Sequence, residues 1–207
     1  MESAERGQLI SGGWEALGAN DWTTARTRFE EARELAESAE ALDGLGRALH
    51  FEGDYLQAIE LTERAFAGYC AEGRSADAAD RARWLAFLQA TINGNTAAAG
   101  GWMARAEELL EGTDECASHG WLTLDRAPFT RDPAERERLA SAALAIAKRF
   151  GDTDLEYDAL SLLGEACVAA GKITEGMRHA DQAMTAVSSG EVTGIVAVSD
   201  ILSLIHI

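Results

Sequence analysis

The stretch that decides the fold is LDGLGRALHFEGDYLQAIELTERA, residues 42–65. Apolar and small residues recur in it at spacings of three and four, and these are Leu42, Leu45 and Leu49 before the centre and Tyr55, Ala58, Thr62 and Ala65 after it. Such spacing places each set on one face of a helix. At the centre, Gly53 can end a helix and Asp54 can cap the next one. The stretch therefore predicts two helices joined by a tight turn.

The same turn chemistry recurs along the chain. The predicted inter-helix turns contain Asn20, Asp21, Gly53, Asp54, Gly94, Asn95, Asp132 and Gly171. Asp132 precedes a proline, which is tolerated at the first helical position because its missing N–H would be unpaired there anyway. A second stretch, LSLLGEACVAAGKITEGMRHADQA at 160–183, repeats the pattern of residues 42–65. Equivalent alanines at positions 25 and 58 fit the roughly 34-residue period of helix-turn-helix repeats.

These patterns predict an all-α fold, a right-handed α-solenoid of about five helix-turn-helix pairs. Helix-favouring residues dominate, and only two prolines occur in 207 residues. The expected organisation is an N-terminal tail at 1–7, a repeat array at 8–188, the start of a further helix at 189–201 and a non-native tail at 202–207.

Charge and hydropathy exclude several classes of function. The chain carries 35 acidic and 18 basic side chains, a formal net charge of −17. Such a field repels phosphate backbones and anionic lipid, so we expect no direct nucleic-acid binding and no membrane association. No apolar run is long enough for a signal peptide or a membrane span, which predicts a cytoplasmic protein.

Motifs that could carry chemistry are incomplete. The three cysteines (Cys70, Cys116, Cys167) and the histidines His50, His119 and His179 show no metal-ligand spacing, so we expect no metal. GLGRAL at 44–49 lacks the third glycine of a dinucleotide fingerprint, and Gly171-Lys172 lacks the Ser or Thr of a phosphate loop. No nucleophile stands beside a base. We therefore expect no catalytic residues, no cofactor and no enzyme.

Residues 42–65 resemble the consensus of tetratricopeptide (TPR) repeats, with Leu45-Gly46 in the first helix and Gly53-Asp54-Tyr55 in the turn. Thr62 departs from it, because a large aromatic is usual there. The resemblance implies a protein or peptide partner, or self-association, on the concave side formed by the first helix of each pair. Placing the pattern on the sequence puts these residues in that groove: Trp14, Glu40, Asp43, Arg47, His50 and Glu165. The residues with which some TPR proteins hold an acidic chaperone tail are missing.

Longer blocks resemble the helical-repeat region of large actinobacterial LuxR-type transcriptional regulators. They include GWEALGANDWTTARTRFEEARELAESAEALDGLGRALHFEGDY at 13–55 and GDTDLEYDALSLLGEACVAAGKITEGMRHADQAM at 151–184. The resemblance implies an interaction or sensing module of a LuxR-family regulator, which reaches DNA only through a C-terminal helix-turn-helix domain that is missing here. A free-standing TPR adaptor that scaffolds a protein complex is the alternative.

The last six residues bear on that choice. LSLIHI at 202–207 resembles the in-frame translation of a transposon-end adapter used in preparing sequencing libraries, so we expect it to be foreign to the protein. The alternative is an apolar terminal helix, IVAVSDILSLIHI, which packs on the preceding pair.

Overall fold

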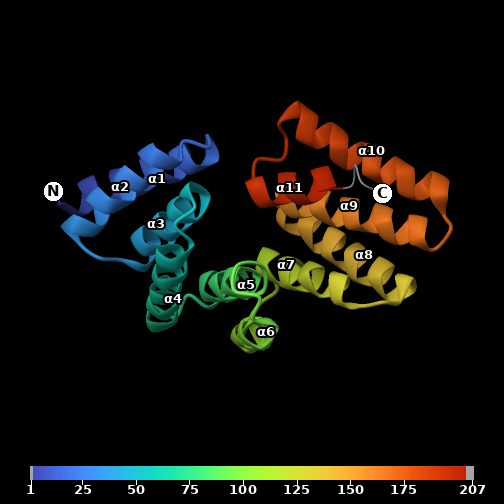
Figure 1. Ribbon diagram of the computed structural model, residues 1–207, viewed down its shortest axis with the longest axis horizontal. Coiled ribbons are helices and arrows are strands. Elements are labelled where there is room, and N and C mark those ends of the chain that lie inside the picture. The colour runs from blue at the N-terminus through green and yellow to red at the C-terminus, as the bar shows by residue number, and fades with distance from the viewer. Residues whose placement is uncertain (1, 204–207) are drawn as a thin grey trace. The chain divides into compact units, whose positions relative to one another are not determined.

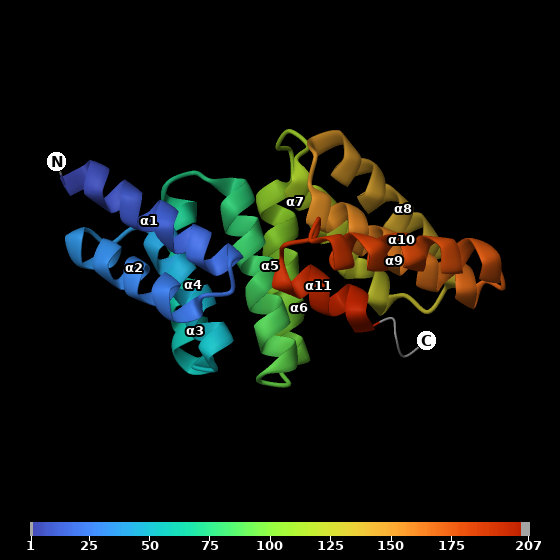
Figure 2. The ribbon, with the colours of Figure 1, turned by 90° about the horizontal axis from the view of Figure 1, so that it is seen from above.

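The computed structural model describes residues 2–203, and within them the chain forms eleven α-helices and one short 3₁₀ helix (Figure 1). The helices are α1 (Glu2–Gly18), α2 (Trp22–Leu35), α3 (Ala39–Glu52), α4 (Tyr55–Ala71), α5 (Ser75–Thr91), α6 (Thr96–Leu110), α7 (Ala117–Arg126), α8 (Pro133–Phe150), α9 (Thr153–Ala169), α10 (Ile173–Ser189) and α11 (Ile195–Ser203), with η1 (Ala127–Phe129) between α7 and α8. Consecutive helices pack as antiparallel pairs (Figure 2). The all-α prediction is confirmed, and five pairs precede α11. None of the described helices combines the length and apolar composition that a membrane span needs.

The chain divides into two compact units after Thr113, so the expected array at 8–188 runs through both. The first unit contains α1 to α6 and the second α7 to α11. The expected tail at 1–7 differs from the structure, because residues 2–7 form the first turns of α1. Acidic residues near a helix start are favoured by the helix dipole, and Glu5 is one of them.

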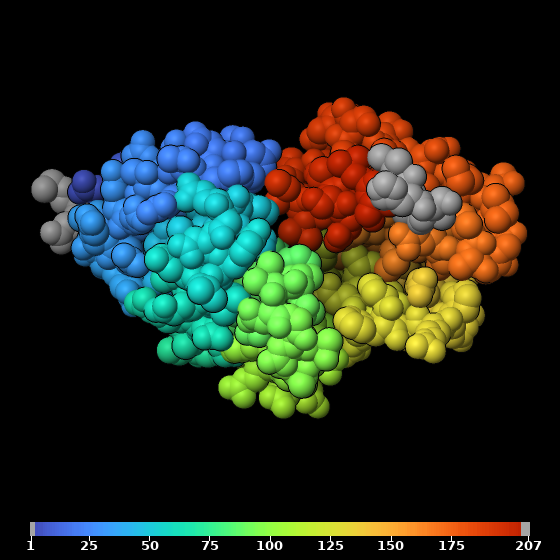
Figure 3. All heavy atoms as spheres, viewed as in Figure 1, coloured from blue at the N-terminus to red at the C-terminus, as the bar shows by residue number. Residues whose placement is uncertain are grey.

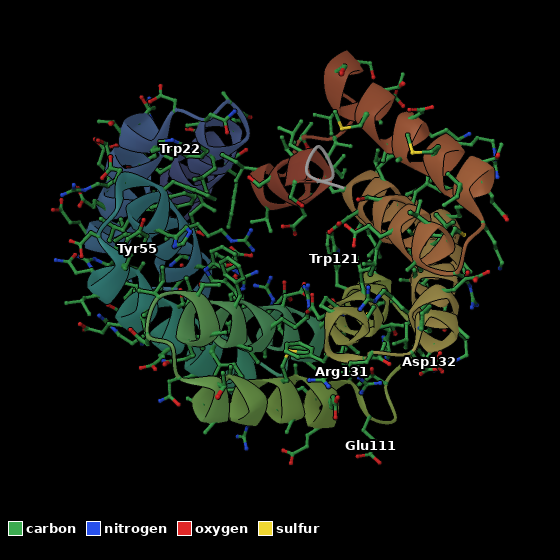
Figure 4. The ribbon with its side chains drawn as sticks, turned by 45° about the vertical axis from the view of Figure 1, so that its right-hand side comes forward. Trp22, Tyr55, Glu111, Trp121, Arg131 and Asp132 are labelled. Atoms are coloured by element: carbon green, nitrogen blue, oxygen red, sulfur yellow. The ribbon has the colours of Figure 1, made fainter. Side chains whose placement is uncertain are left out.

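Side chains at the predicted turns cap the helices that follow them. Four of these residues accept a backbone N–H of the next helix, at 3.1 Å for Asp21, 3.3 Å for Asp54, 3.0 Å for Asn95 and 3.1 Å for Asp132. Four others adopt the left-handed conformation that ends a helix, namely Asn20 (φ 60°), Gly53 (φ 92°), Gly94 (φ 61°) and Gly171 (φ 82°). Figure 4 labels Asp132 at the start of α8. Local sequence chemistry thus sets the helix boundaries.

Small residues allow the helices of a pair to cross closely. A Cβ atom on Gly46 of α3 would lie 3.3 Å from the Ala58 carbonyl oxygen of α4. In the α9–α10 pair the crossing is tighter, because a Cβ on Gly176 would lie 2.6 Å from the Gly164 carbonyl oxygen. At 2.6 Å, a side chain on Gly176 would displace the backbone, whereas at 3.3 Å a side chain on Gly46 would need its neighbours to move by only a few tenths of an ångström.

Each unit has its own core. In the first, the fully buried ring of Phe29 fills the space that Gly13 of α1 and Gly44 of α3 leave open, since a Cβ on either would clash with it. In Figure 3 the atoms of α1 to α4 form one continuous surface. In the second, one cluster joins α7, α8 and α9 through Leu124, Ala143, Ala147, Leu155 and Ala159.

The last described helix packs on the pair before it. Ala197 and Ile201 of α11 are buried against Ala183 and Ala186 of α10. The helix expected to start within 189–201 begins at Ile195 and continues to Ser203. The first two residues of the expected foreign tail therefore belong to α11, and residues 204–207 lie outside the described part of the chain.

Candidate functional site

Five of the six predicted groove residues lie in the first unit. Trp14 is on α1, and α3 carries Glu40, Asp43, Arg47 and His50 at intervals of three and four. Such intervals place the α3 side chains on one side of the helix. Glu165 lies on α9 in the second unit and is described separately below.

Asp43 is the centre of a buried polar network and is itself 5% exposed. Its carboxylate accepts hydrogen bonds from Arg47 Nε at 3.1 Å, from an Arg81 guanidinium nitrogen of α5 at 2.6 Å and from the Tyr69 hydroxyl of α4 at 3.3 Å. The prediction that Asp43 contacts a partner is corrected by this geometry, because the side chain is enclosed and its oxygens are occupied. Asp43 instead holds Arg47 and fixes α3 against α4 and α5.

Electrostatics of the network favour the ionised pair. Burial alone would raise the pKa of Asp43, but the charges of Arg81 and then Arg47 outweigh it and hold that pKa below its ordinary value. Burial and the Asp43 charge raise the pKa of Tyr69, which stays protonated and donates. Arg81 is also 5% exposed, so Asp43 and Arg81 compensate each other's charge. Either residue alone would be an uncompensated buried charge.

Arg47 is the accessible member of this network. Its side chain is 37% exposed, and its guanidinium carbon lies 5.3 Å from the centroid of the Trp14 ring. Trp14 in turn meets the buried Phe29 ring edge to face at 5.2 Å. A guanidinium over an indole gains cation–π attraction. The Trp14 ring under the guanidinium and the hydrogen bond to Asp43 thus hold Arg47 in one orientation.

Glu40 lies at the start of α3 and pairs with Arg74, at 2.9 Å. Arg74 also bonds Asp77 at 2.9 Å and lies over the Tyr69 ring at 4.5 Å. The ion pairs connect the turn between α4 and α5 to α3. They remain partly exposed to solvent, so each adds little stability.

His50 lies among aromatic rings. Its ring centroid is 4.9 Å from that of Trp84 on α5 and 5.4 Å from that of Tyr55 at the start of α4. Trp84 stacks on Phe87 at 5.0 Å, and the side chains of Tyr55 and Phe87 are each 41% exposed. Tyr55 is labelled in Figure 4. Burial lowers the pKa of His50, so its ring is neutral at pH 7.

Two polar atoms in this aromatic group lack a partner among the described residues. They are Nδ1 of His50 and Nε1 of Trp84, both buried. An unpaired buried polar atom costs about 1–3 kcal/mol. We define the α1–α3–α5 face as Trp14, Arg47, His50 and Trp84, all partly buried. This face combines the guanidinium of Arg47, which Asp43 and Trp14 fix in place, with aromatic ring edges and two polar atoms that lack a hydrogen-bond partner among the described residues.

The predicted groove omitted two residues of α5, namely Trp84, which belongs to this face, and Arg81, which is buried and pairs with Asp43. Arg81 lies on α5 among the buried alanines Ala78 and Ala82. A charged side chain on an apolar helix stripe indicates a buried ion pair, because such residues are rarely buried unless paired. That signal could have identified Arg81, whereas its partner depends on which helices face each other.

Glu165 has different surroundings in the second unit. Burial raises its pKa, and the charge of Arg136 opposes the shift. Asp200 of α11 belongs to the same region. Partial desolvation, followed by the charges of Asp125 and Glu165, raises the pKa of Asp200 to about 6. Glu165 therefore lies near both an arginine and a second carboxylate.

A possible metal-ligand set also lies in the second unit, where none was expected. Ligand atoms of Cys167, Glu175 and His179 all lie within 4.8 Å of one another. From its spacing along the sequence, His179 was predicted to have no other metal-ligand residue near it. That prediction is wrong for His179. The antiparallel pairing of α9 with α10 brings Cys167 beside it. Burial lowers the pKa of His179 and raises that of Cys167.

Comparison with known proteins identifies the fold. No family model and no curated protein matches the sequence. The quorum sensor NprR from B. thuringiensis, in its apo form, matches at 12% identity with a TM-score of 0.69, over 99% of this chain and 59% of that one. BtubC from P. vanneervenii matches at 16% identity and a TM-score of 0.58, over 92% of each chain.

A third structure carries repeats of a stated kind. A kinesin light chain candidate from Podosopora anserina, with nearly identical TPR-like repeats, matches at 17% identity and a TM-score of 0.56, over 89% of this chain and 95% of that one. At these identities the likeness concerns the fold alone. The chain therefore has the TPR-like helical-repeat fold.

Proposed function

We propose that the chain is a non-enzymatic interaction and sensing module that binds a protein or peptide segment on the α1–α3–α5 face. The observation that carries the proposal is the restraint of Arg47. A buried ion pair adds little net stability compared with apolar packing, so stability alone is a weak reason for the Asp43–Arg81 pair. Its effect is to hold the partly exposed guanidinium of Arg47 over Trp14.

The face favours a segment of particular chemistry. Arg47 suits a carboxylate, because a guanidinium offers parallel donors to both oxygens. The partly exposed rings of Tyr55 and Phe87, which contact His50 and Trp84, suit an apolar or aromatic side chain. Aromatic and arginine residues dominate the binding energy of many protein interfaces. The partner segment is therefore expected to combine an acidic residue with an apolar one.

We further propose that this module belongs to a cytoplasmic LuxR-family transcriptional regulator. The resemblance of residues 13–55 and 151–184 to the repeat region of those regulators supports this context. The fold of the quorum sensor NprR over 99% of the chain is compatible with a sensing role. With a net charge of −17, the chain itself is expected not to bind duplex DNA at physiological salt, and DNA would be reached through a separate domain.

Site-specific photocrosslinking in the source cells tests the binding face. A photoreactive residue at position 47 should capture a defined partner, which mass spectrometry can identify. The matched control is position 64, where Arg64 of α4 is similarly exposed and pairs with Glu37. The same adducts at both positions, or none at position 47, would contradict the proposal.

Reading the source DNA from the codon for Asp200 onward tests the regulator context. A frame that continues into a basic helix-turn-helix segment supports the regulator. A genuine stop codon directly after Ile207 would instead favour the free-standing adaptor, while the binding face would still be tested by the crosslinking.

A further inference from the structure

The last helix pair contains a cluster of three potential metal ligands. Cys167 on α9 is 1% exposed, and His179 on α10 is 9% exposed. Glu175 lies one turn before His179 on α10, and its Oε1 is 4.0 Å from Nε2 of that ring. One donor atom from each of the three lies within 4.8 Å of the others. Glu175 is exposed, so the cluster is open to solvent on its carboxylate side.

Helix packing alone does not require these residue types. In the sequence match between 42–65 and 160–183, Leu49 corresponds to Cys167 and Leu61 to His179. Both leucines are buried, at 3% and 5% exposure. A Cβ on Gly46 would lie 3.5 Å from Cβ of Leu61, and a Cβ on Gly164 would lie 3.5 Å from Cβ of His179. The same place at the helix crossing is therefore filled by an aliphatic side chain in one pair and an imidazole in the other.

The position of Glu175 also differs between the pairs in favour of a metal ligand. Gln57 of the first pair corresponds to Glu175 of the second. An amide is a poor ligand for a soft divalent ion, whereas a carboxylate is a common one. At these three positions the second pair thus carries good ligands for such an ion where the first pair carries poor ones or none.

We propose that Cys167, Glu175 and His179 bind a thiophilic divalent cation such as Zn²⁺, with water as the fourth ligand. Thiolate, imidazole and carboxylate are established zinc ligands, and three protein ligands leave one coordination position open. The thiol proton leaves to solvent when the metal binds. Glu175 and His179 are four residues apart on α10, which places them on one face of the helix.

The surrounding charges are compatible with a bound cation. Lys172 is paired with Glu137 of α8, at 2.6 Å, so its charge is offset. Arg178 approaches Nε2 of His179 at 3.3 Å, but its side chain is exposed and can turn toward solvent. The bound metal would connect α9 to α10 and stiffen the pair.

Titration of the full chain with Co²⁺ tests the site directly. We expect one equivalent to produce sulfur-to-cobalt charge-transfer absorption together with the visible bands of tetrahedral Co²⁺, and Zn²⁺ to abolish both by displacement. Zn²⁺ should also raise the melting temperature, because a ligand that binds only the folded state stabilises it. The absence of any thiolate band up to millimolar Co²⁺ would overturn the proposal.

Two cysteine variants provide a matched comparison. Cys167→Ser should remove the charge-transfer band, while Cys116→Ser should keep it. Cys116 is a stringent control because its Sγ lies 3.4 Å from Nδ1 of His119, which gives a second thiol beside an imidazole. A band that survives Cys167→Ser, or that disappears with Cys116→Ser, would assign the metal elsewhere and overturn the proposal.

A further pair of variants separates lost ligands from lost folding. Cys167→Leu combined with His179→Leu introduces the residues that the first pair carries, so the helical circular dichroism should be retained while Co²⁺ binding is lost. Glu175→Gln should weaken the affinity at least about tenfold, because even groups outside the ligand set alter metal affinity by that amount. Unchanged affinity in both variants would exclude the proposed ligands.

Discussion

The α3–α4 and α9–α10 pairs share a backbone design and differ in chemistry. Gly46 and Gly164 occupy the close crossing, and Gly53 and Gly171 end the first helix of each pair in the left-handed conformation. Between these shared positions the side chains differ. The charge is reversed where Arg47 corresponds to Glu165, and an aliphatic side chain is replaced by a thiol where Leu49 corresponds to Cys167. The two helix pairs thus share the crossing and the turn, while other positions carry different chemistry.

The two pairs differ most at the position of Asp43, which corresponds to Ser161 in α9. Both side chains are buried, at 5% and 3% exposure. Asp43 is ionised and bonds Arg81, whereas Ser161 is neutral. The first pair therefore depends on a charge balance that the second does not have.

Asp43→Ala should have the largest effect on stability. It leaves Arg81 buried without its partner, which typically costs about 3–5 kcal/mol. The free energy of unfolding from urea denaturation measures the loss, and hydrogen exchange should locate it in the first unit. Ser161→Ala is the matched control and should cost less than about 1.5 kcal/mol, the usual limit for a neutral hydrogen bond. Equal losses in the two variants would contradict a special role for the buried pair.

Gly176→Ala should be the next most damaging change. The new Cβ would lie 2.6 Å from the Gly164 carbonyl oxygen, and such overpacking costs about 1–3 kcal/mol. The corresponding residue of the first pair is already Ala58, so the variant measures how much tighter the second crossing is.

Gly100→Ala in α6 is the control for that substitution. Nothing lies within 4 Å of the Cβ it would add, so it should stabilise the chain by about 0.5–1 kcal/mol through the higher helix propensity of alanine. Stabilisation by Gly176→Ala as well would show that the second crossing can relax.

The contrast also explains what could be predicted from sequence. Helix boundaries were predictable because Asp54, Gly53 and their equivalents act on their immediate neighbours. Arg81 and the pairing of Cys167 with His179 were not, because they depend on which helices pack together. The predicted groove included both Arg47, which is partly exposed, and Asp43, which is buried, since the TPR pattern gives the side of a helix and not the depth of burial.

A smaller difference concerns the turn residues that follow the two glycines. Asp54 accepts the Gln57 backbone N–H at 3.3 Å, whereas Lys172 makes no capping hydrogen bond and pairs with Glu137 at 2.6 Å. Asp54→Ala should therefore cost about 1 kcal/mol. Lys172→Ala should cost less than Asp54→Ala, because exposed ion pairs add little. Urea midpoints at low and high salt would check both. Salt should remove most of the Lys172→Ala effect, whereas the Asp54→Ala effect should largely persist because a hydrogen bond is lost with the side chain. A larger loss at Lys172 than at Asp54 would reverse this ranking.

The smallest predicted effect concerns how folding stability depends on pH, because the contributions of Asp43 and Asp200 change with pH in opposite directions. Asp43 has a lowered pKa in the folded state, so its stabilisation is present above pH 4 and is lost as the pH falls further. Asp200 is the opposite case, with a folded pKa of about 6 against an unfolded value of about 3.9. A raised pKa means that the folded state binds the proton more tightly, so the stabilisation from Asp200 is complete below pH 4 and is lost as the pH rises through 6. Because this side chain is exposed, the effect should stay below about 1 kcal/mol.

Hydrogen exchange in α11, corrected for the intrinsic pH dependence of exchange, measures this effect where it arises. The wild-type helix should be better protected at pH 5 than at pH 7, since protonation of Asp200 removes first the desolvation cost of its charge and then its repulsion with Asp125 and Glu165. Asp200→Asn is neutral at both values and should make protection in α11 nearly independent of pH. The same pH dependence in both proteins would mean that another group titrates in the second unit. With the expected result, the contribution of Asp200 to α11 would increase between pH 7 and 5, whereas the contribution of Asp43 to the first unit would be lost only below pH 4.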